Sequence, residues 1–339
     1  MNWKDREAPA PGAPNVIRFG GAGGDPKYSA TNDLAAFKLN NLMFTNDNGS
    51  VTNVLAGNPL EFENSGAAVE QWGGGSFIVS NIINLTTGVT FRGEGAGTVV
   101  LATNVTGIGS VSKQGPWTLV LGGRSSFSGP VTVDSTGGML RFDRPYGLGA
   151  NPVTVSNGTV FANLGAMAYT NGNGAAQTTL VTGINSLWTN SAGFVIGANG
   201  RVTVTNGGSL FGAGDSYVGT NGANSAVIIV GGPGVISRWA VGATIGATKT
   251  LTVGAGVAGT SNVLLIDGGG IAGGAVVTNV AAFKLGLSGA SSNQVTVANG
   301  GRLFTGAGTI GSAASYNTVS VVSSNSTWNL GNNSLIMTG

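Results

Sequence analysis

The sequence predicts an all-β protein, a right-handed parallel β-helix (β-solenoid) in which short strands stack turn upon turn. Glycine accounts for 61 of the 339 residues, only 8% of residues are charged, and 41% are hydrophobic. Glycine, asparagine, threonine, serine and valine favour strands and tight corners over long helices. A disordered chain would be poor in β-branched and aromatic residues, so the hydrophobic fraction indicates a continuous, narrow core.

Short alternating runs are the second observation, and they are clearest between Lys113 and Gly149. The runs Thr118–Leu121, Val131–Val133 and Met139–Phe142 alternate from side to side, and each ends at a glycine-containing corner. The spacings between them are too long for tight hairpins, but they suit strands that pair one turn further along the chain. We therefore interpret this stretch as one turn, or slightly more, of a β-helix.

Recurring phrases are the third observation. The phrase VTVTNGGSLF at 202–211 recurs almost verbatim as VTVANGGRLF at 295–304. A tryptophan also follows a β run three times, from Val181 to Trp188, from Val230 to Trp239 and from Val321 to Trp328. Duplicated phrases indicate stacked repeats. Val-x-Val anchors near 202, 228, 251, 264, 295 and 319 predict turns of about 23–31 residues. In such turns we expect columns of aliphatic side chains inside, ladders of asparagine side chains at the corners, and glycines at positive φ in the bends.

The order of these patterns divides the chain into three parts. Residues 1–30 are rich in proline and glycine around one strand, Asn15–Phe19, and fit a cap over an open end. Residues 31–164 are predicted to form the first turns, and residues 165–339 continue the helix with a second style of repeat. Asn40–Thr45 is predicted as a strand, whereas Asp33–Leu39 fits either a strand or a short helix with Asp33 as its N-cap. Further strands are predicted at Ser76–Val79, Ile82–Leu85, Val89–Arg92 and Thr98–Ala102.

The stretch that begins at Lys113 resembles the autotransporter-associated β-strand repeat, which typically reads K-x-G-x-G-T-L-x-L-x-G-x-N-x-Y-x-G-x-T-x-V-x-x-G-T-L. The matching phrases are Lys113–Gly115, Thr118–Leu121, Phe127–Gly129, Val131–Val133, Gly138–Arg141 and Leu148-Gly149. Pro116-Trp117 replaces the usual glycine, and Ser126-Phe127 stands where asparagine and tyrosine are more common. The lead-in is also similar, at Asn2-Trp3, Ala8-Pro9, Phe19–Gly21 and Thr31–Leu34, so the resemblance covers roughly residues 1–160.

This resemblance implies a secreted bacterial β-helix that is displayed at the cell surface or in the extracellular matrix. The segment from Met1 to Asp5 has neither the basic region nor the apolar region of a signal peptide. We therefore expect that a leader is absent from this chain. The resemblance thus implies a non-enzymatic structural or adhesive protein. The alternative is a polysaccharide-binding or polysaccharide-degrading β-helix.

Composition excludes several kinds of chemistry. The chain has no cysteine and no histidine, so disulfides, thiolate metal sites, zinc catalysis and histidine-based triads are ruled out. The formal charge of +2 comes from scattered residues, and no basic run could follow a phosphate backbone. Nucleic acid is therefore not an expected partner. No apolar stretch reaches the ~18–20 residues that a membrane span needs.

No cofactor or metal is expected either. Gly254–Gly259 and Gly306–Gly311 match GxGxxG, but a dinucleotide site needs this loop to open a helix, and both strings are followed by β runs. We interpret both strings as corners. Gly20–Asp25 and Gly212–Asp215 faintly resemble calcium-binding glycine repeats, but each has one aspartate, and simple turns are favoured.

An enzyme of the pectin-processing kind would need clustered carboxylates in a groove. Beyond Asp143 the chain has only Asp215 and Asp267 as acids. Glu61 and Glu63 would point to one side of a strand, with Glu70 nearby, yet surface charge that protects a strand edge explains them equally well. The sequence therefore favours a protein without enzymatic activity.

Two groups of apolar residues are the candidate interaction sites. Trp188, Trp239 and Trp328 could form an exposed aromatic track for glycans, although core or corner packing is favoured. The chain ends on the apolar run Leu335, Ile336 and Met337 without a polar cap, and an uncapped turn can pair with another chain. We expect head-to-tail self-association, including filaments, unless further turns of a longer precursor cover this end. Surface polysaccharide is the other expected partner.

Overall fold

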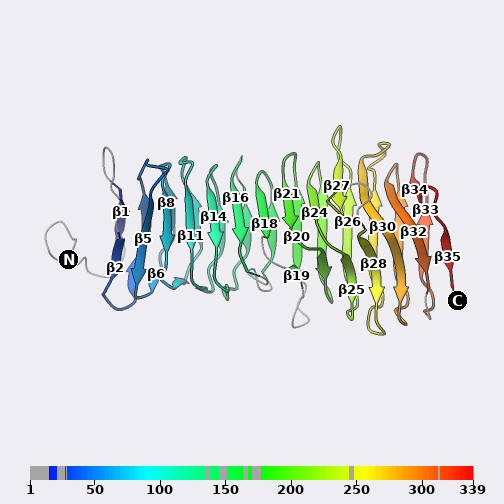
Figure 1. Ribbon diagram of the computed structural model, residues 1–339, viewed down its shortest axis with the longest axis horizontal. Coiled ribbons are helices and arrows are strands. Elements are labelled where there is room, and N and C mark those ends of the chain that lie inside the picture. The colour runs from blue at the N-terminus through cyan, green and yellow to red at the C-terminus, as the bar shows by residue number, and fades with distance from the viewer. Residues whose placement is uncertain are drawn as a thin grey trace. The chain divides into compact units, whose positions relative to one another are not determined.

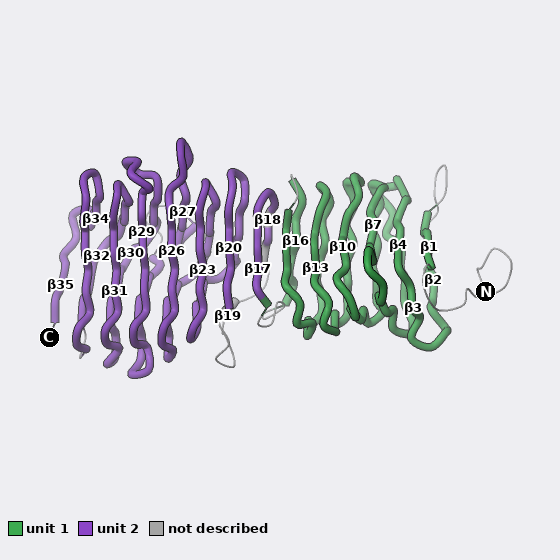
Figure 2. The backbone as a smooth tube through the Cα atoms, turned by 180° about the vertical axis from the view of Figure 1, so that it is seen from behind, with its two compact units in different colours: residues 1–151 green, residues 152–339 purple. Residues whose placement is uncertain are grey.

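The computed structural model describes residues 15–20, 27, 29–134, 137–144, 151–162, 167–169, 177–243, 248–311 and 314–338. In these ranges the chain forms the strands β1 to β35 and no helix. The chain divides into two compact units, Met1–Asn151 and Pro152–Gly339 (Figure 2). Each unit is a stack of coils whose strands pair in parallel with those of the next coil (Figure 1). The prediction of an all-β parallel β-solenoid is confirmed.

Unit 1 contains three parallel sheets, called A1, B1 and C1. Sheet A1 consists of β1 (Val16–Phe19), β4 (Asn41–Phe44), β7 (Ala68–Gln71), β10 (Val89–Arg92), β13 (Val111–Lys113) and β15 (Val131–Val133). Sheet B1 consists of β2 (Ser29–Asn32), β5 (Thr52–Gly57), β8 (Ser76–Val79), β11 (Thr98–Leu101), β14 (Thr118–Leu121) and β16 (Met139–Phe142). Sheet C1 consists of β3 (Phe37–Leu39), β6 (Leu60–Phe62), β9 (Ile83–Leu85) and β12 (Val105–Gly107).

The core of unit 1 is built from columns of inward side chains, one from each coil. In sheet B1 the register places Phe77, Val99, Leu119 and Leu140 in one column, and all four are buried. Phe44 from sheet A1 stacks on Phe77 with ring centroids 4.2 Å apart, so the inner faces of the two sheets meet. Each such buried side chain contributes about 1.5–3 kcal/mol, and the contribution recurs in every coil.

Unit 2 contains a sheet A2 and a sheet B2. Sheet A2 consists of β17 (Val153–Val155), β20 (Thr178–Thr182), β23 (Arg201–Thr205), β26 (Ala226–Val230), β29 (Val263–Asp267), β31 (Gln294–Ala298) and β33 (Thr318–Val321). Sheet B2 has a first row of β18 (Thr159–Ala162), β21 (Leu187–Asn190), β24 (Ser209–Gly212), β27 (Ser237–Ala240) and β34 (Thr327–Asn329). Its second row consists of β19 (Met167–Tyr169), β22 (Phe194–Ile196), β25 (Ser216–Thr220), β28 (Thr250–Ala255) and β35 (Leu335–Met337).

Two long strands, β30 (Ala275–Leu287) and β32 (Arg302–Ile310), run through both rows of sheet B2. Their pairing is interrupted by a register shift between Val277 and Val280. A shift of this kind is a β-bulge, which bends the strand and turns side chains in new directions.

The repeated phrases of the sequence occupy the same column of sheet A2. Val202, Val227, Leu264, Val295 and Val319 follow one another in register, so the near-identical phrases at 202–211 and 295–304 lie three coils apart. Each phrase turns the same corner through an asparagine and a glycine at positive φ, Asn206-Gly207 and Asn299-Gly300. The recurrence therefore reflects one structural position, as predicted.

Asparagine side chains form a ladder beside this column. The Asn293 oxygen Oδ1 accepts hydrogen bonds from both the backbone N–H and the side-chain Nδ2 of Asn262, at 3.0 and 2.9 Å. The Asn317 oxygen accepts the same pair from Asn293, both at 3.0 Å. Asn262 and Asn293 are fully buried, so these bonds satisfy polar groups that water does not reach. The predicted asparagine ladder is confirmed.

Most predicted strands are found within a residue of their expected ends, one open alternative is decided, and two interpretations need correction. Asp33–Leu39 forms no helix but ends in strand β3. The anchor near 251 lies in β28 of sheet B2, and not in sheet A2 with the other anchors. In the first glycine string Gly254 and Ala255 end β28 and Gly256–Gly259 turn the corner after it, whereas most of Gly306–Gly311 belongs to β32. Residues 1–14 of the predicted cap and the predicted division after 164 lie outside the described residues.

Candidate functional site

The three tryptophans of the sequence phrase belong to a single column of sheet B2. In register order this column consists of Val160, Trp188, Leu210, Trp239, Val277, Leu303 and Trp328. Trp188 and Trp239 are fully buried, and Trp188 packs edge-to-face on Phe194 with centroids 5.5 Å apart. These two rings cannot stack on a glycan, so they are core residues and form no exposed track.

Trp328, the last member of the column, is partly exposed. Its Nε1 donates a hydrogen bond to Thr305 Oγ1 at 3.0 Å, and its ring packs edge-to-face on Phe283 at 5.5 Å. Two contacts that point inward hold the ring against the core. Trp328 therefore also packs as a core residue, at the coil where the described chain ends.

The apolar run at 335–337 lies on the last described coil. Leu335, Ile336 and Met337 are 40%, 53% and 74% exposed. Leu335 continues the inward column of Phe283 and Gly308, and Met337 continues that of Leu285 and Ile310. Ile336, by contrast, follows Lys284 and Thr309 on the outer face. Only Leu335 and Met337 of this run thus belong to the cross-section of the core.

The carboxylates that a catalytic site would need have separate partners in unit 1. Glu63 Oε2 pairs with Lys38 Nζ at 2.7 Å, and Glu61 Oε1 accepts a hydrogen bond from Asn84 Nδ2 at 3.3 Å. The bond to Glu63 raises the pKa of Lys38 above its ordinary value. Glu61 stands in β6 of sheet C1, whereas Glu70 stands in β7 of sheet A1. The structure thus places Glu70 on a different sheet from Glu61, while Glu63 follows the end of β6.

Glu70 is the centre of a small polar cluster. Trp72 Nε1 donates to Glu70 Oε2 at 2.8 Å, and the Arg92 guanidinium donates to Oε1 at 2.9 and 2.6 Å. Burial alone would raise the pKa of the Glu70 carboxyl, but the hydrogen bonds from Trp72, Arg92 and Asn41 and the charge of Arg92 hold the pKa below its usual value. Glu70 is therefore kept ionised, which suits a structural ion pair and not a general acid.

A buried lysine in unit 1 was not anticipated from the sequence. Lys113 is fully buried, and its Nζ donates to the carbonyl oxygens of Gln114 and Gly115, both at 2.8 Å. The ammonium also lies 4.2 Å from the centre of the Trp117 ring. Burial lowers the pKa of Lys113 to about 7, while the carbonyls and the ring favour the charged form. The signal in the sequence was the alternation of β13, which assigns residue 113 to the inside.

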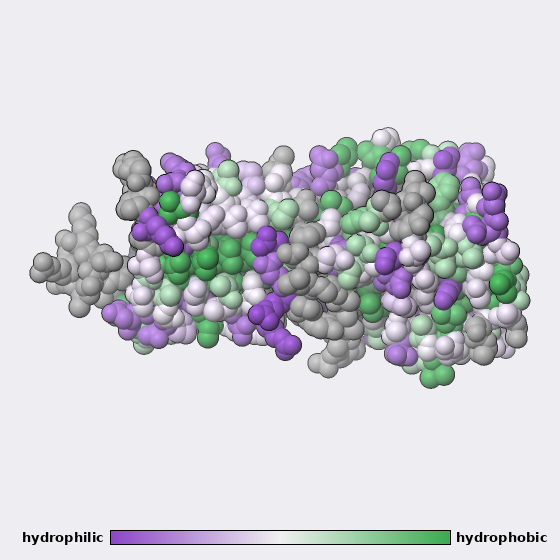
Figure 3. Space-filling view, viewed as in Figure 1, coloured by the Kyte–Doolittle hydropathy of each residue, from purple (hydrophilic) through white to green (hydrophobic). Residues whose placement is uncertain are grey.

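The outer face of sheet B1 carries a hydrophobic row. Val54, Ile78 and Val100 follow one another in register, with Thr52, Ser76 and Thr98 in a parallel row of hydroxyls two residues earlier. Figure 3 shows the corresponding hydrophobic band across β5 to β14. Val54, Ile78 and Val100 are partly exposed and uncharged, whereas Val120, which continues the row in β14, is buried. The next residue in register is Arg141, which forms an ion pair with Asp143. A regular face of this composition suits contact with another extended, weakly charged surface.

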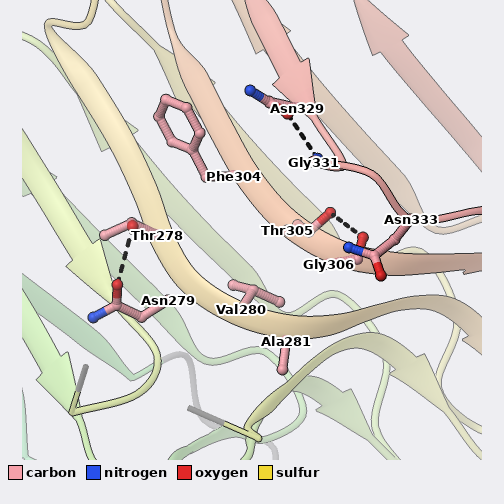
Figure 4. Close-up of a pocket in the computed structure, with 10 residues that line it drawn as sticks. All are labelled: Thr278, Asn279, Val280, Ala281, Phe304, Thr305, Gly306, Asn329, Gly331 and Asn333. Atoms are coloured by element: carbon pink, nitrogen blue, oxygen red, sulfur yellow. Dashed lines mark hydrogen bonds between the residues drawn. The ribbon is translucent and has the colours of Figure 1, made fainter. Parts of the chain in front are cut away.

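A groove of about 470 Å³ lies on unit 2 beside the bulge of β30 (Figure 4). Its lining consists of Thr278, Asn279, Val280, Ala281, Phe304, Thr305, Gly306, Asn329, Gly331 and Asn333. None of these residues is charged. One signal of this site is present in the sequence, because the alternation of the run AVVTNVAAF breaks at Thr278-Asn279.

Of the two glycine strings with an aspartate, the structure describes the second, and its aspartate has a partner within the protein. Asp215, which ends the string Gly212–Asp215, accepts a hydrogen bond from the Thr250 backbone N–H at 2.7 Å and so joins two neighbouring coils. Among the described residues there is no cluster of three or more acidic side chains that could hold a metal ion. In the same part of the chain, no helix is long and apolar enough to cross a membrane. The string Gly20–Asp25 lies mostly outside the described residues.

The fold and these contacts define the chain as a parallel β-solenoid with a repeated core. Comparison with protein-family models, with characterised proteins and with solved structures finds no match.

Proposed function

We propose that this chain is a non-enzymatic structural or adhesive β-solenoid of the bacterial cell surface or extracellular matrix, related to autotransporter-type passenger proteins, which assembles head to tail. The observation that carries the proposal is the last described coil. Val321, Leu335 and Met337 continue core columns, yet they are 45%, 40% and 74% exposed. Among the described residues, β33, β34 and β35 each pair with a neighbouring strand on one side only, and a coil of another copy can pair with such edges and cover the apolar columns.

Such a contact joins two different surfaces and does not close on itself, so it propagates as a fibre. In a longer protein the next coil of the same chain would occupy this position instead. The low charge of the chain and the uncharged row Val54, Ile78 and Val100 on the outer face of sheet B1 support an adhesive role as well, since such a surface loses little hydration when it contacts a neutral polymer.

The assembly is tested by light scattering and electron microscopy of the purified chain. We expect growth that increases with concentration, and filaments at high concentration. Leu335→Lys places a charge in the core cross-section and should abolish growth. Ile336→Lys is the matched control, because the same charge one residue later lies on the outer face and should change growth little. A strictly monomeric particle at high concentration, or equal effects of the two variants, would overturn head-to-tail assembly.

The absence of catalysis is tested separately. Glu61, Glu63 and Glu70 each have their own structural partners, which favours a supporting role for these carboxylates. Incubation with neutral and acidic polysaccharides should release no new reducing ends and no unsaturated products. Turnover that disappears in Glu61→Gln or Glu63→Gln would show that the protein is an enzyme.

Display outside the cell is tested by antibody labelling of intact cells.

A further inference from the structure

The bulge in β30 creates an unusual environment for one aromatic side chain. Val277 pairs with Leu303, and Val280 pairs with Thr305, so Thr278 and Asn279 together lie opposite the single residue Phe304. The next strand places Asn329 on the other side of Phe304. Phe304 is partly exposed. Figure 4 shows its ring between Thr278-Asn279 and Asn329, with Thr305 and Asn333 further along the groove.

Hydrogen bonds within the protein hold one wall of the groove in place. Asn279 Nδ2 donates to the Gly242 carbonyl at 2.8 Å, and its Oδ1 accepts from Thr278 Oγ1 at 3.2 Å. Asn279 has a positive φ of 61°, which asparagine tolerates better than most residues. The bulged wall is thus preorganised before any ligand arrives.

The opposite wall keeps amide groups for a ligand. Asn329 Oδ1 accepts from the Gly331 backbone N–H at 2.7 Å, and Asn333 Nδ2 donates to the Leu330 carbonyl at 3.0 Å. The bonds between described residues leave the Asn329 nitrogen as a donor and the Asn333 oxygen as an acceptor. One donor and one acceptor therefore lie in the same groove as the partly exposed ring of Phe304.

We propose that this groove binds a neutral saccharide, with a sugar ring stacked on Phe304 and its hydroxyls bonded to Asn329 and Asn333. A sugar ring has an apolar face of C–H groups and an edge of hydroxyls, and the groove offers the matching ring and amides. The volume of about 470 Å³ is within the roughly 300–1,000 Å³ typical of small-molecule sites. The lining carries no charge, so a neutral sugar fits better than a uronate. The groove lies on the outer face of sheet B2, and binding there does not depend on head-to-tail assembly.

The test is calorimetric titration of the full chain with neutral hexasaccharides of β-glucan, xylan and mannan, and with an oligogalacturonate as the acidic comparison. At least one neutral oligosaccharide should bind saturably and more tightly than the acidic one. Phe304→Ala should weaken that binding by about tenfold or more, because the stacking surface is lost. Phe304→Trp should retain binding, whereas Phe304→Leu, which keeps apolar volume without a ring, should not.

Tyr316→Asn serves as the matched control. It removes an aromatic side chain of unit 2 that is 85% exposed and lies outside the groove, and asparagine suits its positive φ of 60°. Its binding and thermal unfolding should equal those of the unchanged chain, and unfolding of the Phe304 variants should be similar. The proposal is overturned if no neutral oligosaccharide binds, if the acidic one binds more tightly, or if Phe304→Ala leaves binding unchanged.

Discussion

At position 113 a lysine occupies a place that alternation assigns to the core. Register puts Lys113 in a column between Phe91 and Val133, both of which are fully buried. The ammonium is tolerated there because two carbonyl oxygens and the face of Trp117 replace water around it. Burial still lowers the pKa of Lys113 to about 7, so the folded chain releases a proton that the unfolded chain keeps.

This difference predicts a pH-dependent stability of unit 1. The ordinary lysine pKa is 10.5, so between pH 7 and 10.5 the unfolded chain binds more protons than the folded chain, and the free energy of unfolding rises with pH. Urea unfolding from pH 6 to 10 should show this rise in the unchanged chain. Lys113→Met, which removes the titrating group and keeps a long apolar side chain, should flatten it. An identical slope in the two proteins would contradict the depressed pKa.

Gly254 shows why glycine and asparagine occur together at the corners of unit 2. Its φ is +73°, and a Cβ atom added there would overlap the side-chain amide of Asn293. Asn293 in turn holds Asn262 and Asn317 through four hydrogen bonds. The asparagine ladder thus fits into the space that a side chain at position 254 would occupy.

The pairing predicts a non-additive double substitution. Asn293→Ala leaves buried groups of Asn262 without acceptors and should lower the free energy of unfolding by about 1–3 kcal/mol. Gly254→Ala should lower it by at least as much, through overlap and the strained φ. In the double variant the overlap with Asn293 is gone, so its loss should be smaller than the sum of the two. Urea unfolding measures the free energy of unfolding of all three variants. Gln294→Ala, at an exposed neighbouring position, is the control, and its free energy of unfolding should stay within about 0.5 kcal/mol of that of the unchanged chain.

At the scale of elements, individual strands could be predicted from the sequence better than their partners. Thr118–Leu121 and Met139–Phe142 were located to the residue, because alternation and flanking glycines are local properties of a strand. The anchor at Leu251 was placed in one series with anchors that lie in sheet A2, since a Val-x-Val pattern looks the same in sheets A2 and B2. Which sheet a strand joins depends on the length of the preceding corner and on the register. The residues of the strand determine neither of these.

The same limit applies to the sites. Recurrence of Trp188, Trp239 and Trp328 indicated one column, and core or corner packing was favoured over an exposed track, but alternation alone did not show which face of the strand is inside. The groove at Phe304 was missed because it depends on the bulge opposite, at Thr278-Asn279, and a bulge is a property of two paired strands. Lys113 was recognised as part of a repeat phrase, yet a charged side chain is not expected inside a core without its acceptors in view.

At the scale of the whole molecule, stability is distributed along the chain of coils. In both units the strands inside a sheet pair with the strands one coil before and one coil after them, as β24 and β30 flank β27. Solenoids of this kind are stabilised by the sum of contacts between nearest neighbours, so a local loss spreads only to adjacent coils. The core columns connect these coils but contain no residue that contacts every coil.

This distribution predicts a local response to a severe core substitution. Trp239 is fully buried in the column between Leu210 and Val277, so Trp239→Ala should cost about 3–5 kcal/mol. Hydrogen exchange should then become faster in β24, β27 and the first half of β30, while β8 and β11 of unit 1 keep the protection of the unchanged chain. Trp328→Ala should cost less, because that ring is partly exposed and its loss leaves a smaller cavity. If exchange instead rose equally in both units, the chain would unfold as one cooperative body, and nearest-neighbour contacts would not account for its stability.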